Sequence, residues 1–430
     1  MRQENVQEAG TMSANQKTIY VYDDFSQEEP ILLGMLYVNV IKGGETYSFE
    51  YSNGWLKQTN LSVSLDPELI PYGGRQFSNG KNIFGMFADA SPDRWGRVLM
   101  NKRERIRAQK EARKPRKLYD SDYLLGVYDE TRMGGIRFKL DPRGTFLSDD
   151  RETQVPPWAT LRTLEEASRN FENDESGLSE KWLNQLIKPG SSLGGARPKA
   201  TVVDTMGQLW IAKFPSKNDE NDTGAWEMVT HDLAKLCGLN VSDAKLEKFS
   251  KLGSTYLVKR FDRNGKKRIH FASAMTLLGK TDGASAADGT SYLDMADFIK
   301  SNGASPKADL VELWKRIVFN MAVSNTDDHL RNHAFILMEK GWILSPLYDV
   351  NPVPYGDELS LNVDEYDNSI RIDLAVETAV RFGLTRADAE KSAGNVLKTV
   401  RENWQPLAVK YGLTRGQMEE MRPAFSACFE

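Results

Sequence analysis

The sequence predicts an α+β protein of two or three domains, β-rich in its N-terminal half and helical in its C-terminal part. The chain has 430 residues, more than one hydrophobic core usually organises. In its first half, segments such as Thr46–Tyr51 alternate polar and apolar residues, as half-buried strands do. From Leu277 onward apolar residues recur at helical spacing, with Leu310, Trp314 and Ile317 on one stripe.

The composition is that of an ordinary globular protein, with 40% apolar and 27% charged residues. The net charge of −4 creates no global cationic field, so nucleic-acid binding would need a local patch. Cys237 and Cys428 are the two cysteines, which predicts no disulfide framework and a reducing, cytoplasmic location. The sequence contains no run of 18 apolar residues, so it predicts no membrane-spanning helix. Residues 1–17 lack the apolar core of a signal peptide.

Changes in pattern divide the chain into five parts. We expect a disordered tail over residues 1–17, a β-rich domain over 18–145, a linker over 146–160, a part with strands and a glycine-rich loop over 161–265, and a helical part over 266–430.

Two features stand out in the N-terminal domain. Residues 82–100 read as a helix interrupted at Ser91-Pro92-Asp93, with Ser91 as the cap of the second piece and Pro92 at its first position. The segment from Lys102 to Lys117 carries nine basic and two acidic residues. It is either a solvated helix end and loop or a contact surface for nucleic acid or an acidic partner.

The main glycine-rich loop runs from Pro189 to Lys199 and leads into two predicted strands, Lys199–Val203 and Gln208–Phe214. Glycines let backbone N–H groups approach and cradle phosphate oxygens, although a plain hairpin turn would have the same composition. The spacing is not that of a Walker loop. Lys213 shares a strand face with apolar neighbours, so it either meets an anion or extends to water from an edge strand.

A helix follows the second strand, with Trp226 and Val229 on its apolar stripe and Gly238 at its end. Glu227, in its first turn, could pair with Lys213 or simply interact with the helix dipole. Residues 256–261 and 268–271 read as the two strands of a hairpin.

The segment Ser324–His333 carries the most specific signal for function. Asp327 and Asn332 are five residues apart, the spacing of the catalytic-loop Asp and Asn of protein kinases, and Asp349 follows where the later, metal-binding Asp of that motif order should lie. Two alternatives compete with this interpretation. His329 and His333 could share a helix face in a zinc hydrolase, but the Glu of that motif is missing, and Asp327 with Asp328 could simply cap a helix. The order of glycine-rich loop, Lys213, Asp327 and Asp349 favours an ATP-dependent phosphotransferase.

At this point the chain resembles the HipA-type serine/threonine kinases, the toxin components of bacterial toxin–antitoxin modules. The matching stretches are Ser192–Lys199, Ile211–Pro215, Val258–Arg263, Asn325–Asn332, Leu344–Val350, Ala90–Arg97 and Gly134–Phe138. The resemblance implies a protein-kinase-like fold, a small β-rich lobe plus a helical lobe, with an additional N-terminal β-rich domain.

The resemblance also implies roles for single residues. Asp327 would be the base, and Asn332 and Asp349 would bind Mg²⁺. ATP would lie against Gly194, Gly195, Ala196, Arg197, Pro198, Lys199 and Lys213, with its adenine near Lys259, Arg260 and Phe261 and with His329 and Tyr348 beside it. Ser192 would be autophosphorylated, with Ser191 next to it as an alternative.

The family further implies partners. A dimeric helix-turn-helix antitoxin would neutralise the protein and link it to operator DNA, and the phosphorylated protein substrates include aminoacyl-tRNA synthetases. A non-catalytic, nucleotide-binding corepressor that keeps the same fold remains the competing hypothesis.

Overall fold

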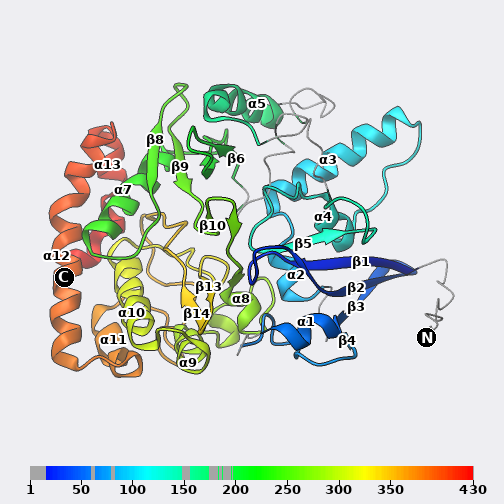
Figure 1. The fold of residues 1–430 in the computed structure, drawn as a ribbon. Coiled ribbons are helices and arrows are strands. Elements are labelled where there is room, and N and C mark those ends of the chain that lie inside the picture. Colours follow the sequence, from blue (N-terminus) through cyan, green and yellow to red (C-terminus); the bar gives the residue numbers. More distant parts are fainter. Residues whose placement is uncertain are drawn as a thin grey trace, which may run out of the picture.

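The computed structural model describes residues 16–59, 63–78, 83–147, 155–173, 183, 186, 195 and 197–429. These residues form several antiparallel sheets with helices packed around them, which confirms the α+β fold class. In Figure 1 the N-terminal sheet and its helices occupy one side of the molecule, and the remaining sheets and the C-terminal helices occupy the other. Of the predicted tail, residues 1–15 lie outside the described part, while Gln16 and Lys17 already belong to the first strand.

The N-terminal sheet has five antiparallel strands in the order β4-β3-β2-β1-β5. They are β1 (Gln16–Asp23), β2 (Ile31–Ile41), β3 (Gly44–Tyr51), β4 (Arg75–Phe77) and β5 (Ile136–Lys139). Tyr47, Phe49 and Tyr51 are buried, as the alternation predicts. A Cβ at Gly34 would lie 2.3 Å from the carbonyl oxygen of Glu50, so the close approach of β2 to β3 depends on that glycine.

Four helices belong to this part of the chain: α1 (Asn53–Gln58), α2 (Gly85–Asp89), α3 (Arg94–Lys110) and α4 (Asp120–Gly126). The predicted interruption between α2 and α3 is confirmed, but the predicted cap is wrong. Asp93 caps α3, because its carboxylate accepts a 2.8 Å hydrogen bond from the backbone N–H of Gly96. The Ser91 hydroxyl instead donates to the carbonyl of Phe87, so it closes α2 rather than opening α3.

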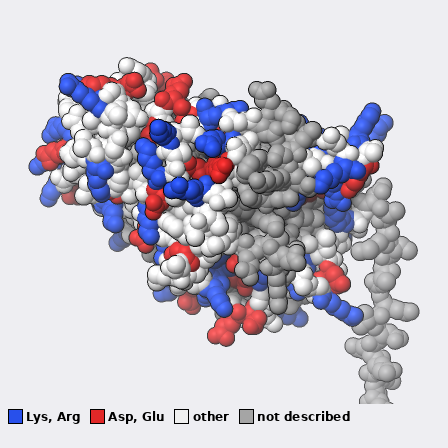
Figure 2. Space-filling model, turned by 90° about the horizontal axis from the view of Figure 1, so that it is seen from above, with Lys and Arg blue, Asp and Glu red and all other residues white. Residues whose placement is uncertain are grey.

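The basic segment 102–117 covers the second half of α3 and the loop after it. Three of its arginines form ion pairs, Arg107 with Glu111, Arg113 with Glu104 and Arg116 with Asp122, at 2.8, 2.5 and 2.8 Å. Figure 2 shows blue side chains with red ones among them at the right edge of the molecule, the side to which α3 projects in Figure 1. This internal pairing favours the solvated face over a free cationic patch.

A second, four-stranded sheet has the order β6-β7-β9-β8. It comprises β6 (Lys199–Val203), β7 (Leu209–Lys213), β8 (Ala244–Glu247) and β9 (Thr255–Lys259), with α5 (Leu161–Asn173) and α7 (Thr223–Leu236) packed nearby. The predicted strand–turn–strand of β6 and β7 is confirmed, with Lys199 opposite Lys213.

The predicted hairpin of residues 256–261 with 268–271 is wrong. β9 pairs with β7 and β8, and only the short strands β10 (Arg263–Asn264) and β11 (Lys267–Arg268) pair with each other. β12 (Phe271–Ser273) joins a third sheet with β13 (Ala334–Met338) and β14 (Gly341–Leu344). The chain therefore leaves one sheet at Lys259 and enters the next at Phe271.

The rest of the chain is mainly helical, as predicted. Its helices are α8 (Ala274–Leu277), α9 (Tyr292–Asn302), α10 (Pro306–Ala322), α11 (Ile372–Thr378), α12 (Arg386–Lys410) and α13 (Arg415–Met421), with 3₁₀ turns at Ala286–Asp288, Ala379–Phe382 and Arg422–Cys428. A further 3₁₀ turn, Trp158–Thr160, directly precedes α5. Buried Trp314, Ile317 and Met321 of α10 lie at the centre of this part. α10 ends directly before the segment 323–333, so the main core positions the residues that carry the chemistry.

Candidate active site

A buried lysine joins three elements that are distant in sequence. Lys213 is the last residue of β7, and its Nζ lies 2.5 Å from Oε1 of Glu227, just after the first turn of α7. The same Nζ lies 2.5 Å from Oδ1 of Asp349, 136 residues further along the chain. The predicted pairing of Lys213 with Glu227 is confirmed, and the contact with Asp349 brings two predicted site residues together.

The electrostatics of this group keep the lysine charged. Burial alone would lower the pKa of Lys213, but the carboxylates of Asp349 and Glu227 outweigh it and raise this pKa above its ordinary value. Burial would raise the pKa of Asp349, but Lys213 holds it below its usual range. For Glu227 burial prevails and the pKa is raised. The site thus holds a cation and an ionised Asp349 at neutral pH.

The segment after α10 presents Asp327 to solvent. Residues 324–333 form turns and no helix, so Asp327 and Asp328 are not helix caps and His329 and His333 share no helix face. The Asp327 side chain is 81% exposed, with the His329 ring Nε2 3.9 Å from its carboxylate. Desolvation in the cleft and the negative charge of Asp349 raise the pKa of Asp327, while His329 opposes them.

The next residue, Asp328, is buried and holds the segment in place through hydrogen bonds. It is 1% exposed, and its Oδ2 accepts hydrogen bonds from Tyr292 Oη at 2.5 Å and from Asn320 Nδ2 at 2.5 Å. The ring Nε2 of buried His333 lies 2.9 Å from the same oxygen. From the sequence, Asp328 was expected at most to cap a helix, and its neighbours Asp327 and His329 gave no signal that it is buried.

The side-chain amide oxygen of Asn332 has no hydrogen-bond partner among the described residues. Its Nδ2 donates to the carbonyl of Asp327 at 2.8 Å, which fixes the orientation of the amide. This oxygen, Oδ1, is buried. Asp349 adds a carboxylate held in a left-handed backbone conformation, with φ +58°. Amide and carboxylate oxygens are the ligands that Mg²⁺ prefers, so Asn332 and Asp349 fit the predicted metal.

A cavity with a largely apolar and aromatic lining lies beside Lys213. Its lining residues are Ile211, Lys213, Glu227, Ser242, Tyr256, Val258, Lys259, Arg260, Phe261, Tyr348 and Asp349. Apolar and aromatic side chains form part of its wall, and the rest is formed by the basic residues Lys213, Lys259 and Arg260 and by the carboxyl groups of Glu227 and Asp349. Tyr348 is fixed there by a 2.7 Å hydrogen bond from its hydroxyl to the carbonyl of Arg331 and by packing against Phe261. Of the predicted adenine contacts, the Arg260 guanidinium is committed elsewhere, to Asp262.

The glycine-rich loop is described only in part. Ser191, Ser192, Gly194 and Ala196 lie outside the described residues, and Gly195 has φ +79°. Arg197 forms a two-point ion pair with Asp219, at 2.9 and 2.5 Å. Lys199 lies 3.0 Å from Asp93. Both predicted phosphate contacts therefore have protein partners here, and Pro198 lies between them.

A second, open cleft lies on the side of Asp327. It is lined by Arg94, Gly195, Met275, residues 281–285, Asp327, His329, Leu330, Arg331 and Ser360. Because Asp327 lines this cleft while Lys213 and Asp349 line the apolar pocket, the candidate base has an accessible space for an acceptor molecule.

The described residues also bear on a metal site and on a membrane-spanning helix. Among the described residues, no three His, Cys, Asp or Glu side chains are grouped so that they could hold a metal ion, which disfavours the zinc hydrolase. In that same part of the chain, none of the helices has the length and apolar character needed to cross a bilayer.

Comparisons with known proteins agree with this geometry. The chain matches two family models, the HipA N-terminal domain over residues 33–114 and the HipA-like C-terminal domain over residues 191–404. It is 27% identical over 247 residues to "Putative kinase Y4mE" of Sinorhizobium fredii, which covers 52% of this chain and 51% of that protein. It is 26% identical over 271 residues to the serine/threonine-protein kinase toxin HipA of Shewanella oneidensis, which covers 55% and 59%. These alignments span just over half the length of the curated relatives.

The fold itself has a match that extends over nearly the whole chain. HipA in the solved complex of Shewanella oneidensis HipA, HipB and operator DNA aligns with a TM-score of 0.67 and 18% identity, over 95% of each chain. This likeness confirms the predicted arrangement of an N-terminal β-rich domain and a kinase-like part. Because the two family models together match most of its length, the chain belongs to the HipA family.

Proposed function

We propose that the protein is an ATP- and Mg²⁺-dependent serine/threonine protein kinase of the HipA type. The observation that carries the proposal is the contact of one buried lysine, Lys213, with both Glu227 and Asp349. Burying a lysine is costly unless anions compensate it, and here three separate elements converge to do so. Protein kinases use a lysine–glutamate pair and a metal-binding aspartate in the same arrangement.

Each residue of the site has a role in this proposal. Lys213 binds phosphate oxygens of ATP, and Asn332, with its unpartnered Oδ1, and Asp349 hold Mg²⁺. A Mg²⁺ ion held by these two residues would supply positive charge that offsets the charge of the phosphates. Exposed Asp327 orients the acceptor hydroxyl and accepts its proton. Lys259, Phe261 and Tyr348 enclose the adenine. His329, which lines the open cleft together with Asp327, faces the nucleotide from that side.

The acceptor and the partners are proposed from the family. The acceptor is a cellular protein, with aminoacyl-tRNA synthetases as the first candidates, in the cytoplasm. The solved relative forms a complex with HipB and operator DNA, which supports a HipB-like helix-turn-helix antitoxin as partner of this chain. In this scheme phosphorylation causes growth arrest, and the antitoxin neutralises it.

Self-inactivation through Ser192 completes the proposal. A phosphate on this loop residue would place about −1.5 to −2 charges where ATP phosphates bind, and repulsion would weaken ATP binding. Intact-mass measurement and peptide mapping after incubation with ATP test it. Modification of Ser191 alone, or undiminished ATP affinity of the phosphorylated protein, would contradict it.

The deciding experiment measures phosphate transfer from γ-labelled ATP by wild type and Asp327→Asn. A kinase labels protein in the wild type and not in the variant, while both bind Mg²⁺–ATP in calorimetry. Nucleotide binding without transfer would identify the non-catalytic corepressor instead. Phosphoproteomics of cells that express each form would name the substrate.

A further inference from the structure

The end of β9 forms one wall of the nucleotide pocket and is tied to the N-terminal domain. Lys259, Arg260 and Phe261 line the pocket, but the Arg260 guanidinium is buried and turns away from it. It donates 2.8 and 2.6 Å hydrogen bonds to the two carboxylate oxygens of Asp262 and a 2.7 Å bond to the carbonyl of Thr131. A pocket residue is thus bonded directly to a loop that lies 129 residues earlier in the chain.

That loop, residues 128–134, accepts hydrogen bonds from several arginines at once. The carbonyl of Arg132 accepts from Arg260 at 3.2 Å, from Arg263 at 2.7 Å and from Arg268 at 3.4 Å. In the opposite direction, the backbone N–H of Gly134 donates to Asp262 at 2.9 Å. Each guanidinium is a rigid planar fork, so these bonds fix the loop and the strand end in one relative position.

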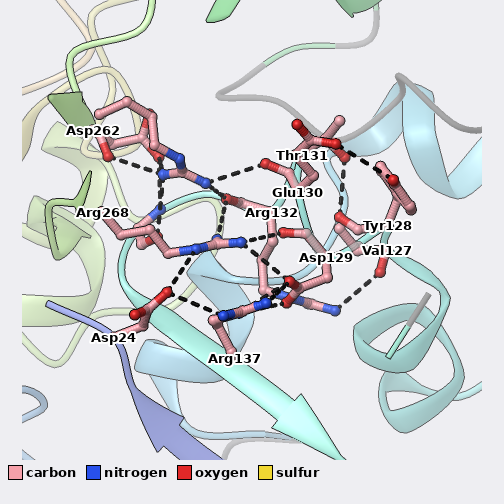
Figure 3. A network of polar contacts seen from close by, with 12 residues as sticks. Asp24, Val127, Tyr128, Asp129, Glu130, Thr131, Arg132, Arg137, Asp262 and Arg268 are labelled. Carbon is pink, nitrogen blue, oxygen red and sulfur yellow. Dashed lines mark hydrogen bonds and ion pairs between the residues drawn. The ribbon is translucent and has the colours of Figure 1, made fainter. Parts of the chain in front are cut away.

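Ion pairs extend this contact to the first strand of the molecule. Arg268 lies 3.2 Å from Asp24, just after β1, and 3.2 Å from Asp129, and Arg137 lies 3.3 Å and 2.6 Å from the same two carboxylates. Figure 3 shows Arg268 and Arg137 pointing toward Asp24 and Asp129, with the loop carbonyls around them. None of these four residues lines the nucleotide pocket.

The positive charge of this arginine–carboxylate cluster is compensated in part by the backbone carbonyls of loop 128–134. Five arginines, at positions 132, 137, 260, 263 and 268, face three carboxylates, those of Asp24, Asp129 and Asp262. Burial lowers the pKa of Arg268 and lowers that of Arg132 to about 9, so their desolvation is incompletely compensated. Backbone carbonyls offset the excess positive charge only while they point at the guanidinium groups. Displacing the loop is therefore costly, and the cluster is stiff.

We propose that Asp24, Asp129 and Arg268 are positioning residues for the nucleotide pocket: through loop 128–134 and Arg260 they set the place of the Lys259–Phe261 wall. The N-terminal domain thereby controls nucleotide affinity from a distance. The inference rests on the proposed function, since it concerns the pocket assigned to ATP.

The test compares Arg268→Met and Asp24→Asn with wild type in the full chain. Arg113→Met is the matched control, because it also breaks ion pairs in the N-terminal domain, with Glu104 and Glu111, away from the cluster. Calorimetry with Mg²⁺ and a non-hydrolysable ATP analogue measures Kd, and ADP formation from ATP measures KM and kcat. We expect Kd and KM to rise about 5- to 20-fold in the two cluster variants, in the lower part of the usual range of coupling between sites. We expect kcat at saturating ATP to stay within about twofold, because Lys213, Asp327 and Asp349 are untouched.

A merely structural role gives a different pattern. Partial unfolding reduces the active fraction and hence the apparent kcat, whereas KM and Kd of the folded molecules stay at the wild-type value. A reduced apparent kcat with unchanged KM and Kd in both variants would overturn the inference. If Arg268→Met does not fold, Asp24→Asn still tests the inference, because the Asp24 carboxylate is partly exposed. If wild type itself binds no analogue, the proposed function falls together with the inference. If wild type binds and both variants bind equally well, only the inference falls.

Discussion

Two adjacent aspartates lie in opposite environments, and we infer different roles for them. Asp327 is 81% exposed beside the open cleft, and Asp328 is 1% exposed and accepts from Tyr292 and Asn320. Removing the charge of the first should affect turnover, and removing that of the second should affect folding.

We therefore predict opposite effects for two neighbouring substitutions. Asp327→Asn should lower kcat by roughly 10²–10⁴, the usual contribution of a positioned base, with an unchanged free energy of unfolding. Asp328→Asn should destabilise the protein by about 1–3 kcal/mol, because the amide cannot accept all the hydrogen bonds that the carboxylate accepts. Steady-state kinetics and urea denaturation of both variants test this. Full activity of Asp327→Asn would show that the Asp327 carboxylate is not needed for the reaction.

His270 should make stability depend on pH. It is 2% exposed, stacks on Phe25 at 4.6 Å, and neither ring nitrogen has a hydrogen-bond partner among the described residues. Burial lowers the pKa of His270 from 6.5 to about 4. The folded state stays neutral while the unfolded state takes up a proton below pH 6.5, so this stability is present above that pH and is lost as the pH falls.

With these pKa values, the loss between pH 7 and pH 5 is about 2 kcal/mol. Urea denaturation of wild type and His270→Phe at both pH values measures it, since other groups titrate equally in both proteins. A pH dependence that is the same in wild type and variant would show that His270 does not cause it.

At the scale of single elements, the start of α3 holds both a helix cap and a buried ion pair. Asp93 caps α3, and the same carboxylate lies 3.0 Å from Lys199, which is 1% exposed. Asp93→Asn keeps a cap of similar strength but removes the negative charge, so it should cost about 3–5 kcal/mol, as breaking a buried pair does. Asp93→Ala should cost about 0.5–2 kcal/mol more, through the lost cap. Equal stability of the two variants in urea denaturation would show that the cap contributes nothing.

The first turn of α7 depends on a glycine. A Cβ at Gly224 would lie 2.1 Å from the carbonyl oxygen of Ser254, so Ala cannot fit unless α7 moves away from the chain that enters β9. Gly224→Ala should cost about 1–3 kcal/mol and weaken the binding of Mg²⁺–ATP, because Glu227 lies only three residues further along the same helix and would move with it. The matched control is Gly394→Ala in α12, where a Cβ meets nothing within 4 Å and helix propensity should improve. Thermal unfolding and calorimetric titration of both variants measure the effects, and undiminished nucleotide affinity of Gly224→Ala would contradict this account.

At the scale of the whole molecule, the N-terminal domain and the rest of the chain share one hydrophobic core. The same cluster of buried side chains includes Phe49 and Phe87 from the N-terminal part and Met275, Trp314 and Trp404 from the C-terminal part. Polar contacts such as the 2.8 Å bond from Ser273 Oγ to Asp89 cross the same boundary. An interface of this kind opposes independent motion of the two parts.

We accordingly predict a single unfolding transition for the full chain. Scanning calorimetry should give a calorimetric enthalpy close to the van't Hoff enthalpy, as in a cooperative two-state transition. The control is the Arg268→Met variant, which should shift the transition without splitting it. Two resolved transitions in wild type would show that the parts fold separately.

Local pattern determined much of this protein. Alternation located β3 and helical spacing located α7 and α10, and the spacing of Asp327, Asn332 and Asp349 indicated the candidate site, because such signals lie within a few residues or follow a motif order. Only the tertiary structure decided that Asp328 is buried, that Asp93 rather than Ser91 caps α3, and that Arg260 turns from the pocket to Thr131. These outcomes depend on which distant groups compete for one donor or acceptor. No sequence pattern records that competition, because its partners, such as Lys213 and Asp349, meet only when the whole chain has packed.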